Sequence, residues 1–338
     1  MINRITLNNF GPLDQLDWQK LGKINLIIGN NGCGKTFLLK AIYSAMRTIE
    51  ECNRGNDQRK ASEILAEKLY WTFQSAKIGD LVSKQADSPL LLELTFDDKA
   101  FDYSFGKDTT KSIPVVNHVG SRVSNSIFLP AKEVLSLHNI ILESREQDKV
   151  FGFDDTYLDL ARALRILPRK GNNFPEFARS RKQLEDMLGG KVEYDEASGH
   201  WQFKKDKQKF SIGVTAEGIK KIAILDTLLG NRYLDKHSVV FIDELESALH
   251  PIAISKLIDI IAMLANRGIQ FFIASHSYFV VKKLFLIAQE QKLSIPVLSK
   301  DKAVDTWQQS DLLNEMPDNA IIDESIRLYE EEVDLAFK

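Results

Sequence analysis

The sequence has only two cysteines, Cys33 and Cys52, among 338 residues. Two cysteines are too few for a disulfide framework or a zinc cluster, and low cysteine use is typical of a reducing cytosol. Long apolar runs are also missing, because the most apolar windows, such as residues 254–264, contain charged residues and are too short to span a bilayer. The first residues lack the pattern of a secretory signal. We therefore expect a cytoplasmic protein with no membrane segment.

An overall excess of basic residues is missing too. The formal net charge is -3, with 44 lysines and arginines against 47 acidic residues, so the chain as a whole lacks the positive charge typical of nucleic-acid-binding proteins. The charge is uneven, however, because residues 311–338 carry nine acids and two bases. The rest of the chain is mildly basic, which permits local anion binding without requiring it.

A glycine-rich turn stands between an apolar run, Ile24–Ile28, and residues with helical spacing, Phe37–Thr48. It matches G-x-x-x-x-G-K-[ST], in which backbone N–H groups and a helix N-terminus surround a phosphate. The lysine is expected to reach the β- and γ-phosphates, and the threonine to supply a hydroxyl to Mg²⁺. The turn predicts binding of ATP and Mg²⁺. The predicted nucleotide-binding residues are Gly29, Asn30, Asn31, Gly32, Cys33, Gly34, Lys35 and Thr36.

A second apolar run, Ser238–Ile242, ends in two carboxylates. We expect Asp243 to join Thr36 as a metal ligand, and Glu244 to orient or deprotonate the attacking water. A third run ends near His276, which we expect to contact the γ-phosphate. Together with the glycine-rich turn, these residues predict hydrolysis of ATP. The predicted catalytic residues are Lys35, Glu244 and His276.

These three motifs, in this order, resemble the ABC-type ATPase head of RecF, SMC and OLD (overcoming-lysogenization-defect) proteins. The opening Ile5–Leu13 and the segment Asp243–Pro251 also carry the resemblance. The second segment is most similar to the OLD-like branch, where a proline is usual at the position of Leu245. The motifs cover residues 1–50 and 210–285, and the rest matches only in size. The resemblance implies a P-loop NTPase fold of the α/β class, with an antiparallel β subdomain and an inserted helical lobe.

The resemblance also implies that two heads enclose two ATP molecules, each offering a signature segment to the other's nucleotide. The candidate signature residues are Thr215, in place of the usual serine, and Gly218. An ordinary helix cap at Thr215 is the alternative. The resemblance also implies a glutamine that links the bound metal to the helical lobe. No glutamine is found at the corresponding place, and Lys132 or Glu133 is expected to replace it.

The alternation of strands and helices predicts a parallel α/β core. The predicted ATPase core comprises residues 1–131 and 210–300, and residues 132–209 form a helical lobe with a short hairpin. Residues 301–338 form an acidic helical tail, capped by Asp323, that either packs on its own head or docks a partner. Other helices are expected at Ile64–Ile78, Val134–Glu143 and Thr156–Leu167.

Two basic clusters are candidate contacts for DNA or RNA. No interleaved aromatic residues support a stacking surface, so solvated faces are the alternative. The clusters are Arg162, Arg165, Arg169 and Lys170 near a predicted helix, and Lys204, Lys205, Lys207 and Lys209 on a predicted hairpin.

OLD enzymes carry a C-terminal nuclease domain, and the 62 residues after His276 are too few for one. By resemblance, we expect an ATPase subunit that forms nucleotide-gated homodimers or higher assemblies. It would control a separate nuclease or toxin as the sensor of a bacterial anti-phage defence system. The alternatives are a RecF-like DNA-repair ATPase and a nucleotide-dependent scaffold without hydrolysis, which the intact Glu244 disfavours.

Overall fold

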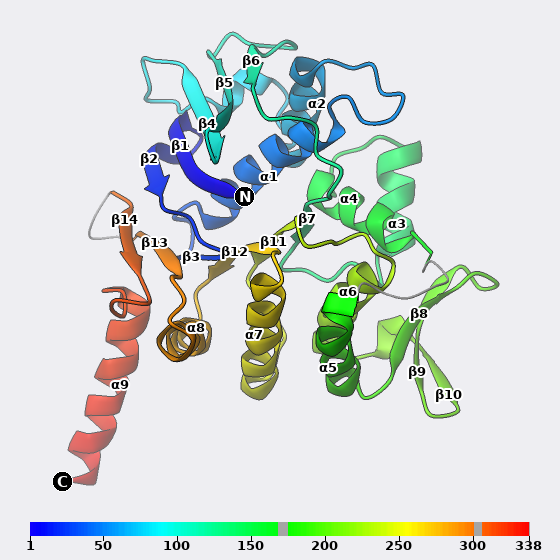
Figure 1. The fold of residues 1–338 in the computed structure, drawn as a ribbon, viewed down its shortest axis with the longest axis vertical. Helices are drawn as coiled ribbons and strands as arrows, with labels where there is room; N and C mark the ends of the chain where they lie inside the picture. Colours follow the sequence, from blue (N-terminus) through cyan, green and yellow to red (C-terminus); the bar gives the residue numbers. More distant parts are fainter. Residues whose placement is uncertain (168–174, 301–305, 338) are drawn as a thin grey trace.

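The computed structural model describes residues 1–167, 175–300 and 306–337, and these form three sheets with helices on both sides of the largest one (Figure 1). The strands are β1 (Ile2–Phe10), β2 (Leu13–Gln19), β3 (Ile24–Gly29), β4 (Leu90–Phe96), β5 (Lys99–Phe105), β6 (Val115–Asn117), β7 (Ile127–Leu129), β8 (Lys191–Asp195), β9 (His200–Lys205), β10 (Gln208–Ser211), β11 (Val239–Asp243), β12 (Gln270–Ser275), β13 (Pro296–Lys300) and β14 (Gln308–Asp311). The α-helices are α1 (Lys35–Glu51), α2 (Ala61–Phe73), α3 (His138–Leu142), α4 (Asp155–Leu164), α5 (Ala178–Leu188), α6 (Glu217–Gly230), α7 (Pro251–Asn266), α8 (Tyr278–Gln291) and α9 (Ala320–Ala336).

The largest sheet has the strand order β14-β13-β3-β12-β11-β7. Its inner strands pair in parallel, and β14 is an antiparallel edge strand on β13. Successive residues of a strand point to opposite faces. Accordingly, Val240 and Ile242 pack in the core formed with α5, α6, α7 and α8, whereas Val239 and Phe241 pack in the core formed with α1. The expected parallel α/β core is confirmed.

The antiparallel sheet, β2-β1-β4-β5-β6, lies on the α1 side of the parallel sheet (Figure 1). Strand β4 alternates buried and half-buried residues, the pattern of a sheet with one face in the core. Buried side chains of β1, β4 and β5 share one hydrophobic core with α1 and with Phe241 and Phe272 of the parallel sheet. Helix α1 is therefore enclosed between the two sheets.

Three predicted helices have different bounds in the structure. The helix expected over Ile64–Ile78 ends at Phe73, since Gln74 takes a left-handed backbone with φ 49°. The helix expected over Val134–Glu143 begins only at His138, because the Glu133 carboxylate accepts a hydrogen bond from the Ser136 N–H and holds a turn there. The helix expected over 156–167 ends at residue 164.

The C-terminal region differs from the prediction in two ways. Residues 301–305 and 338 lie outside the described part, but Gln308–Asp311 form a strand, so this region is helical only from Ala320. Asn319 caps α9 by accepting from the Ile321 N–H at 3.1 Å, whereas Asp323 lies inside the helix. No residue of α9 is buried, and the helix projects away from the sheets (Figure 1). Beyond its first turn, α9 does not pack on its own head.

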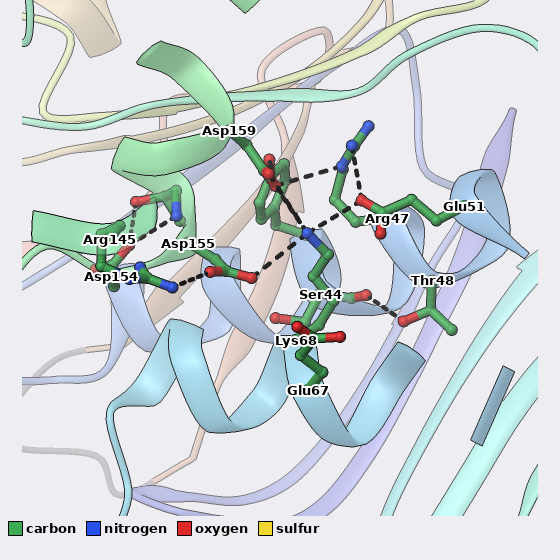
Figure 2. A network of polar contacts seen from close by, with 12 residues as sticks. Ser44, Arg47, Thr48, Glu51, Glu67, Lys68, Arg145, Asp154, Asp155 and Asp159 are labelled. Carbon is green, nitrogen blue, oxygen red and sulfur yellow. Dashed lines mark hydrogen bonds and ion pairs between the residues drawn. The ribbon is translucent and has the colours of Figure 1, made fainter. Parts of the chain in front are cut away.

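A buried network of charges joins α1, α2 and α4 (Figure 2). The Lys68 ammonium nitrogen lies 3.3 Å from one oxygen of Asp159 and 3.4 Å from one oxygen of Asp155. The Nε atom of Arg47 is 3.4 Å from the same Asp159 oxygen. The network ties the helix after the glycine-rich turn to the segment predicted as the helical lobe. Its charged members are Arg47, Glu51, Lys68, Arg145, Asp155 and Asp159.

Asp159 is a shared partner of Lys68 and Arg47 in this network. Its carboxylate also accepts a hydrogen bond from the Tyr43 hydroxyl at 2.8 Å. Burial opposes the charge of Asp159, but the nearby Lys68 and Arg47 outweigh that effect and lower its pKa to about 2. Asp159 is therefore ionised and fully paired in the folded protein.

We expect the substitution Asp159→Asn to destabilise the protein by about 3–5 kcal/mol, because it removes one of the carboxylates that neutralise the buried Lys68 and Arg47. Urea denaturation at pH 7 measures the change. The control is Glu146→Gln, which breaks the exposed pair of Glu146 with Arg162 and should cost only about 0–1 kcal/mol. Equal losses from the two variants would contradict the central place of Asp159 in the network.

Wild type and Asp159→Asn can also be compared at different pH values. The folded pKa of Asp159 is depressed, so its contribution to stability is present above the unfolded value of about 3.9 and is lost as pH falls toward about 2. The difference in stability between wild type and Asp159→Asn should therefore narrow below about pH 4. A difference that widens there would contradict the direction of the shift.

Deletion of residues 324–338 should leave the free energy of unfolding within about 0.5 kcal/mol of the wild-type value. The removed turns of α9 bury no side chain, and changes at exposed positions are usually this small. Thermal and urea unfolding check the expectation. A loss of several kcal/mol would show that α9 is part of the stable head.

Candidate nucleotide-binding site

The predicted site residues meet at one edge of the parallel sheet. Ile28 of β3 is aligned with Ser275 of β12, and Ala274 is aligned with Asp243 of β11. The carboxyl ends of these strands therefore lie side by side, which is where open α/β sheets bind ligands.

The glycine-rich turn leads directly from β3 into α1. Gly29, Gly32 and Gly34 have φ values of 150°, 81° and 100°, which side chains rarely adopt. The Lys35 ammonium folds back over the turn and donates to the main-chain oxygens of Gly29 at 2.7 Å and Asn30 at 3.0 Å. No side chain caps α1 at Gly34, so the first N–H groups of the helix face the turn without a side-chain acceptor.

The structure brings Thr36 and Asp243 into contact, although 207 residues separate them. The Thr36 hydroxyl lies 2.9 Å from Asp243 Oδ2 and 3.1 Å from Oδ1. Burial raises the pKa of the Asp243 carboxyl, the Thr36 hydrogen bond opposes this rise, and the charge of Glu244 adds to it. A cation beside Asp243 would relieve the cost of burying its charge.

These donors and acceptors fit a nucleotide with Mg²⁺. Thr36 and Asp243 offer adjacent oxygen atoms, the ligand type that Mg²⁺ prefers. Among the described residues, no group of three or more His, Cys, Asp or Glu side chains could hold a metal ion. Mg²⁺ bound at Asp243 would therefore be completed by phosphate oxygens and water, as is usual for this ion. The lysine and the helix N-terminus supply the positive side of a phosphate site.

Glu244 begins a tight turn between β11 and α7. Its φ is 50° and that of Ala248 is 62°, so two non-glycine residues of this turn have left-handed backbone. The Glu244 N–H donates to the main-chain oxygen of Ala274 at 3.0 Å. Its carbonyl oxygen accepts from the Lys221 ammonium at 2.6 Å. The backbone of the predicted catalytic residue is thus held on both sides.

Glu246 links this turn to the end of β12, a role that was not predicted from the sequence. Its carboxylate accepts from the Ser275 hydroxyl and from the His276 N–H, each at 2.9 Å. The Nδ1 atom of His276 is 3.4 Å from the same carboxylate, and the His276 side chain is 46% exposed. The third acidic residue of the Asp-Glu-Leu-Glu pattern was the available signal.

The candidate signature residues lie at the start of α6. Thr215 does not cap this helix, since its hydroxyl donates to the main-chain oxygen of Ser211 and the cap position is Ala216. A Cβ atom added to Gly218 would lie 3.0 Å from the main-chain oxygen of Ala248. The structure therefore places Gly218 against the turn that follows Glu244.

The loop after β7 reaches the same neighbourhood. Lys132 and Glu133 line a cavity of about 510 Å³ together with Lys221 and Glu244. Glu133 Oε1 is 3.5 Å from the Lys220 ammonium. The structure thus places both candidate coupling residues beside Glu244.

In each of the two basic clusters, one residue already forms an ion pair within the chain. Arg162 pairs with Glu146 at 2.8 Å, and Lys204 pairs with Glu193 across β8 and β9. Arg169 and Lys170 lie outside the described residues. In the described part of the chain, no helix is long and apolar enough to cross a membrane.

Residues 24–282 match the family model described as "AAA domain, putative AbiEii toxin, Type IV TA system". The chain belongs to this family. The matched region runs from β3 into α8, so it includes the glycine-rich turn, both carboxylates and His276.

A curated relative is the DNA double-strand break repair Rad50 ATPase of Saccharolobus solfataricus. The two are 26% identical over 188 residues, which is 55% of this chain and 20% of that protein. The chain thus corresponds to about a fifth of the length of this relative.

Two solved structures share the fold. An SMC head bound to the C-winged-helix domain of ScpA aligns with a TM-score of 0.56 and 12% identity, covering 92% of this chain and 97% of that one. An Smc head domain with an extended coiled coil, bound to the C-terminal domain of ScpA and derived from Pyrococcus furiosus, aligns at 0.52 and 12% identity over 98% of both chains. The expected fold, an ABC-type ATPase head of the RecF and SMC class, is confirmed.

The glycine-rich turn offers a test of its geometry. A Cβ at Gly29 would lie 2.4 Å from the main-chain oxygen of Lys300, whereas one at Gly32 meets nothing within 4 Å. Gly32→Ala should cost about 1–2 kcal/mol from left-handed backbone alone. Gly29→Ala should cost about 1–3 kcal/mol more, because the main chain must shift. Urea denaturation compares the variants, and equal stability would contradict the close packing of β13 against the turn.

Proposed function

We propose that this chain binds and hydrolyses ATP with Mg²⁺ and assembles through nucleotide-dependent contacts between heads. The observation that carries the proposal is the contact between the Thr36 hydroxyl and the Asp243 carboxylate at 2.9 Å. It joins the glycine-rich turn to the end of β11, as a metal site next to bound phosphates requires.

Each predicted site residue has a role in this proposal. Lys35 would exchange its two main-chain acceptors for the β- and γ-phosphates, and the N–H groups of Gly29–Thr36 would hold the phosphate oxygens. Thr36 and Asp243 would hold Mg²⁺, which neutralises charge developing on the phosphates when bound. Glu244 would orient the attacking water and accept its proton. His276, placed by the bond from its N–H to Glu246, would contact the γ-phosphate.

The assembly is proposed from the exposed surface of the signature segment. Val214, next to Thr215, is 79% exposed, and Ile252, which follows the Glu244 turn, is 63% exposed. Apolar side chains at this edge are suited to contact a second copy of the chain. Thr215 and Gly218 would then meet the nucleotide of the other head in a homodimer or a higher assembly.

For the biological role, we propose the ATPase or sensor component of an anti-phage defence system that controls a separate nuclease or toxin. The family description, which names an AbiEii toxin and a type IV toxin–antitoxin system, supports this role. The exposed helix α9 offers a surface for a partner protein.

A DNA-repair ATPase is the second candidate, and the similarity to a Rad50 ATPase of DNA double-strand break repair favours it. DNA-stimulated hydrolysis, together with an affinity for DNA that falls steeply with salt, would select this role. A rate of ATP hydrolysis that does not change when DNA is added would favour the defence role.

Glu244→Gln should bind Mg-ATP like the wild type but hydrolyse it at least about 100-fold more slowly, because it removes the general base. Blocked hydrolysis should trap the assembled state, so light scattering should show a mass increase on addition of Mg-ATP. Lys35→Ala should show neither nucleotide binding nor the mass increase.

The two variants also separate the rival functions. If the wild-type protein binds ATP and assembles but does not hydrolyse ATP, the chain is a nucleotide-dependent scaffold and the proposed ATPase activity is wrong. If the mass of Glu244→Gln measured by light scattering is the same with and without Mg-ATP, nucleotide-gated assembly is contradicted.

A further inference from the structure

The turn that carries Glu244 has a backbone that needs support. Left-handed conformations at Glu244 and Ala248 are costly for residues with a Cβ atom and persist only where their surroundings enforce them. The side chain of the proposed general base starts from one of these two positions. Its direction therefore depends on the contacts that hold the turn.

One set of contacts comes from the parallel sheet. The Glu244 N–H donates to Ala274, and the Glu246 carboxylate accepts from Ser275 and from the His276 N–H. These bonds attach the turn to the end of β12. None of these three bonds involves α6.

The second set comes from α6. Lys221 is nearly buried, and its ammonium donates to the Glu244 carbonyl oxygen at 2.6 Å. One turn earlier on the same helix, Gly218 packs closely on the main-chain oxygen of Ala248, since an added Cβ atom would lie only 3.0 Å from it. Helix α6 therefore touches both left-handed positions of the turn.

The positive charge of Lys221 lies near several carboxylates. The carboxylates of Glu246, Glu244 and Asp243 all act on the Lys221 ammonium and favour its charged form, although burial is the larger effect and lowers its pKa to about 8. An ammonium group has three donors and no acceptor, so it holds a carbonyl oxygen and offsets the repulsion of neighbouring carboxylates. A neutral side chain could not do both.

We infer that Lys221 is a positioning residue that sets the direction of Glu244 from the start of α6, and so links the signature segment to the general base within one chain. This inference rests on the proposed ATPase function. A shift of α6 when Thr215 and Gly218 meet the other head's nucleotide would be passed to the Glu244 carbonyl oxygen through one hydrogen bond.

The test compares Lys221→Met with Lys221→Arg and with a matched control, Lys220→Met. Lys220 is the adjacent buried lysine of α6, but its ammonium pairs with Glu217 at 2.6 Å and lies 3.5 Å from Glu133. Lys221→Met should lower kcat at least about tenfold, since hydrogen bonds from charged donors are worth more than one factor of ten. Its KM for ATP should stay within about threefold, and Lys221→Arg should recover most of kcat.

A second readout needs no nucleotide. Hydrogen exchange of the amides in residues 244–249 should be faster in Lys221→Met than in wild type and Lys220→Met, because one support of the turn is missing. If Lys221→Met does not fold, Lys221→Gln takes its place in both measurements.

The outcomes separate the inference from the proposed function. Unchanged exchange in residues 244–249, or a kcat equal to that of Lys220→Met, would overturn the role of Lys221. A wild-type protein without hydrolysis would overturn the ATPase proposal, while faster exchange in Lys221→Met would still support the positioning of the turn.

Discussion

The parallel register of β3, β12 and β11 is the constraint on which the rest of the structure depends. Main-chain hydrogen bonds align Ile28 with Ser275 and Ala274 with Asp243. Side chains alternate between the faces of a strand, so a slip of one residue would turn Asp243 away from Thr36. The apolar residues on both faces of β11 and β12 oppose such a slip, because each face packs in its own core. The hydrophobic pattern thus sets the position of the polar site.

The segment between residues 132 and 209 is attached to this framework through α4. Near the glycine-rich turn, Lys40 of α1 pairs with Asp154, the cap of α4, at 2.6 Å. Farther along α1, the buried network around Lys68 and Asp159 holds the same two helices together (Figure 2). Breaking a buried charge network is costly, so α1 and α4 are expected to move as one unit. Helix α6 instead meets the Glu244 turn through one hydrogen bond and a close glycine contact, which require less reorganisation.

The sequence predicted most of the parallel sheet, because its strands are apolar runs that end in glycine or polar residues. It did not predict β2, whose sequence, LDQLDWQ, lacks the strict alternation of a half-buried strand. This strand forms because β1 provides its partner. Helix α8 was also missed. Its buried residues, such as Val280, Leu284 and Ile287, have helical spacing, but the exposed Phe279 and Leu286 obscure that pattern.

The sequence by itself determined the phosphate turn and the residue types of the site, since G-x-x-x-x-G-K-[ST] and an apolar strand ending in Asp-Glu are local patterns. Only the tertiary structure decided which side chains hold these residues in place. Glu246 meets Ser275 and Lys221 meets the Glu244 carbonyl oxygen because separate strands and a helix end at the same edge of the sheet. A hydrogen bond depends on distances of a few tenths of an ångström, and sequence spacing carries no such information for residues on different elements.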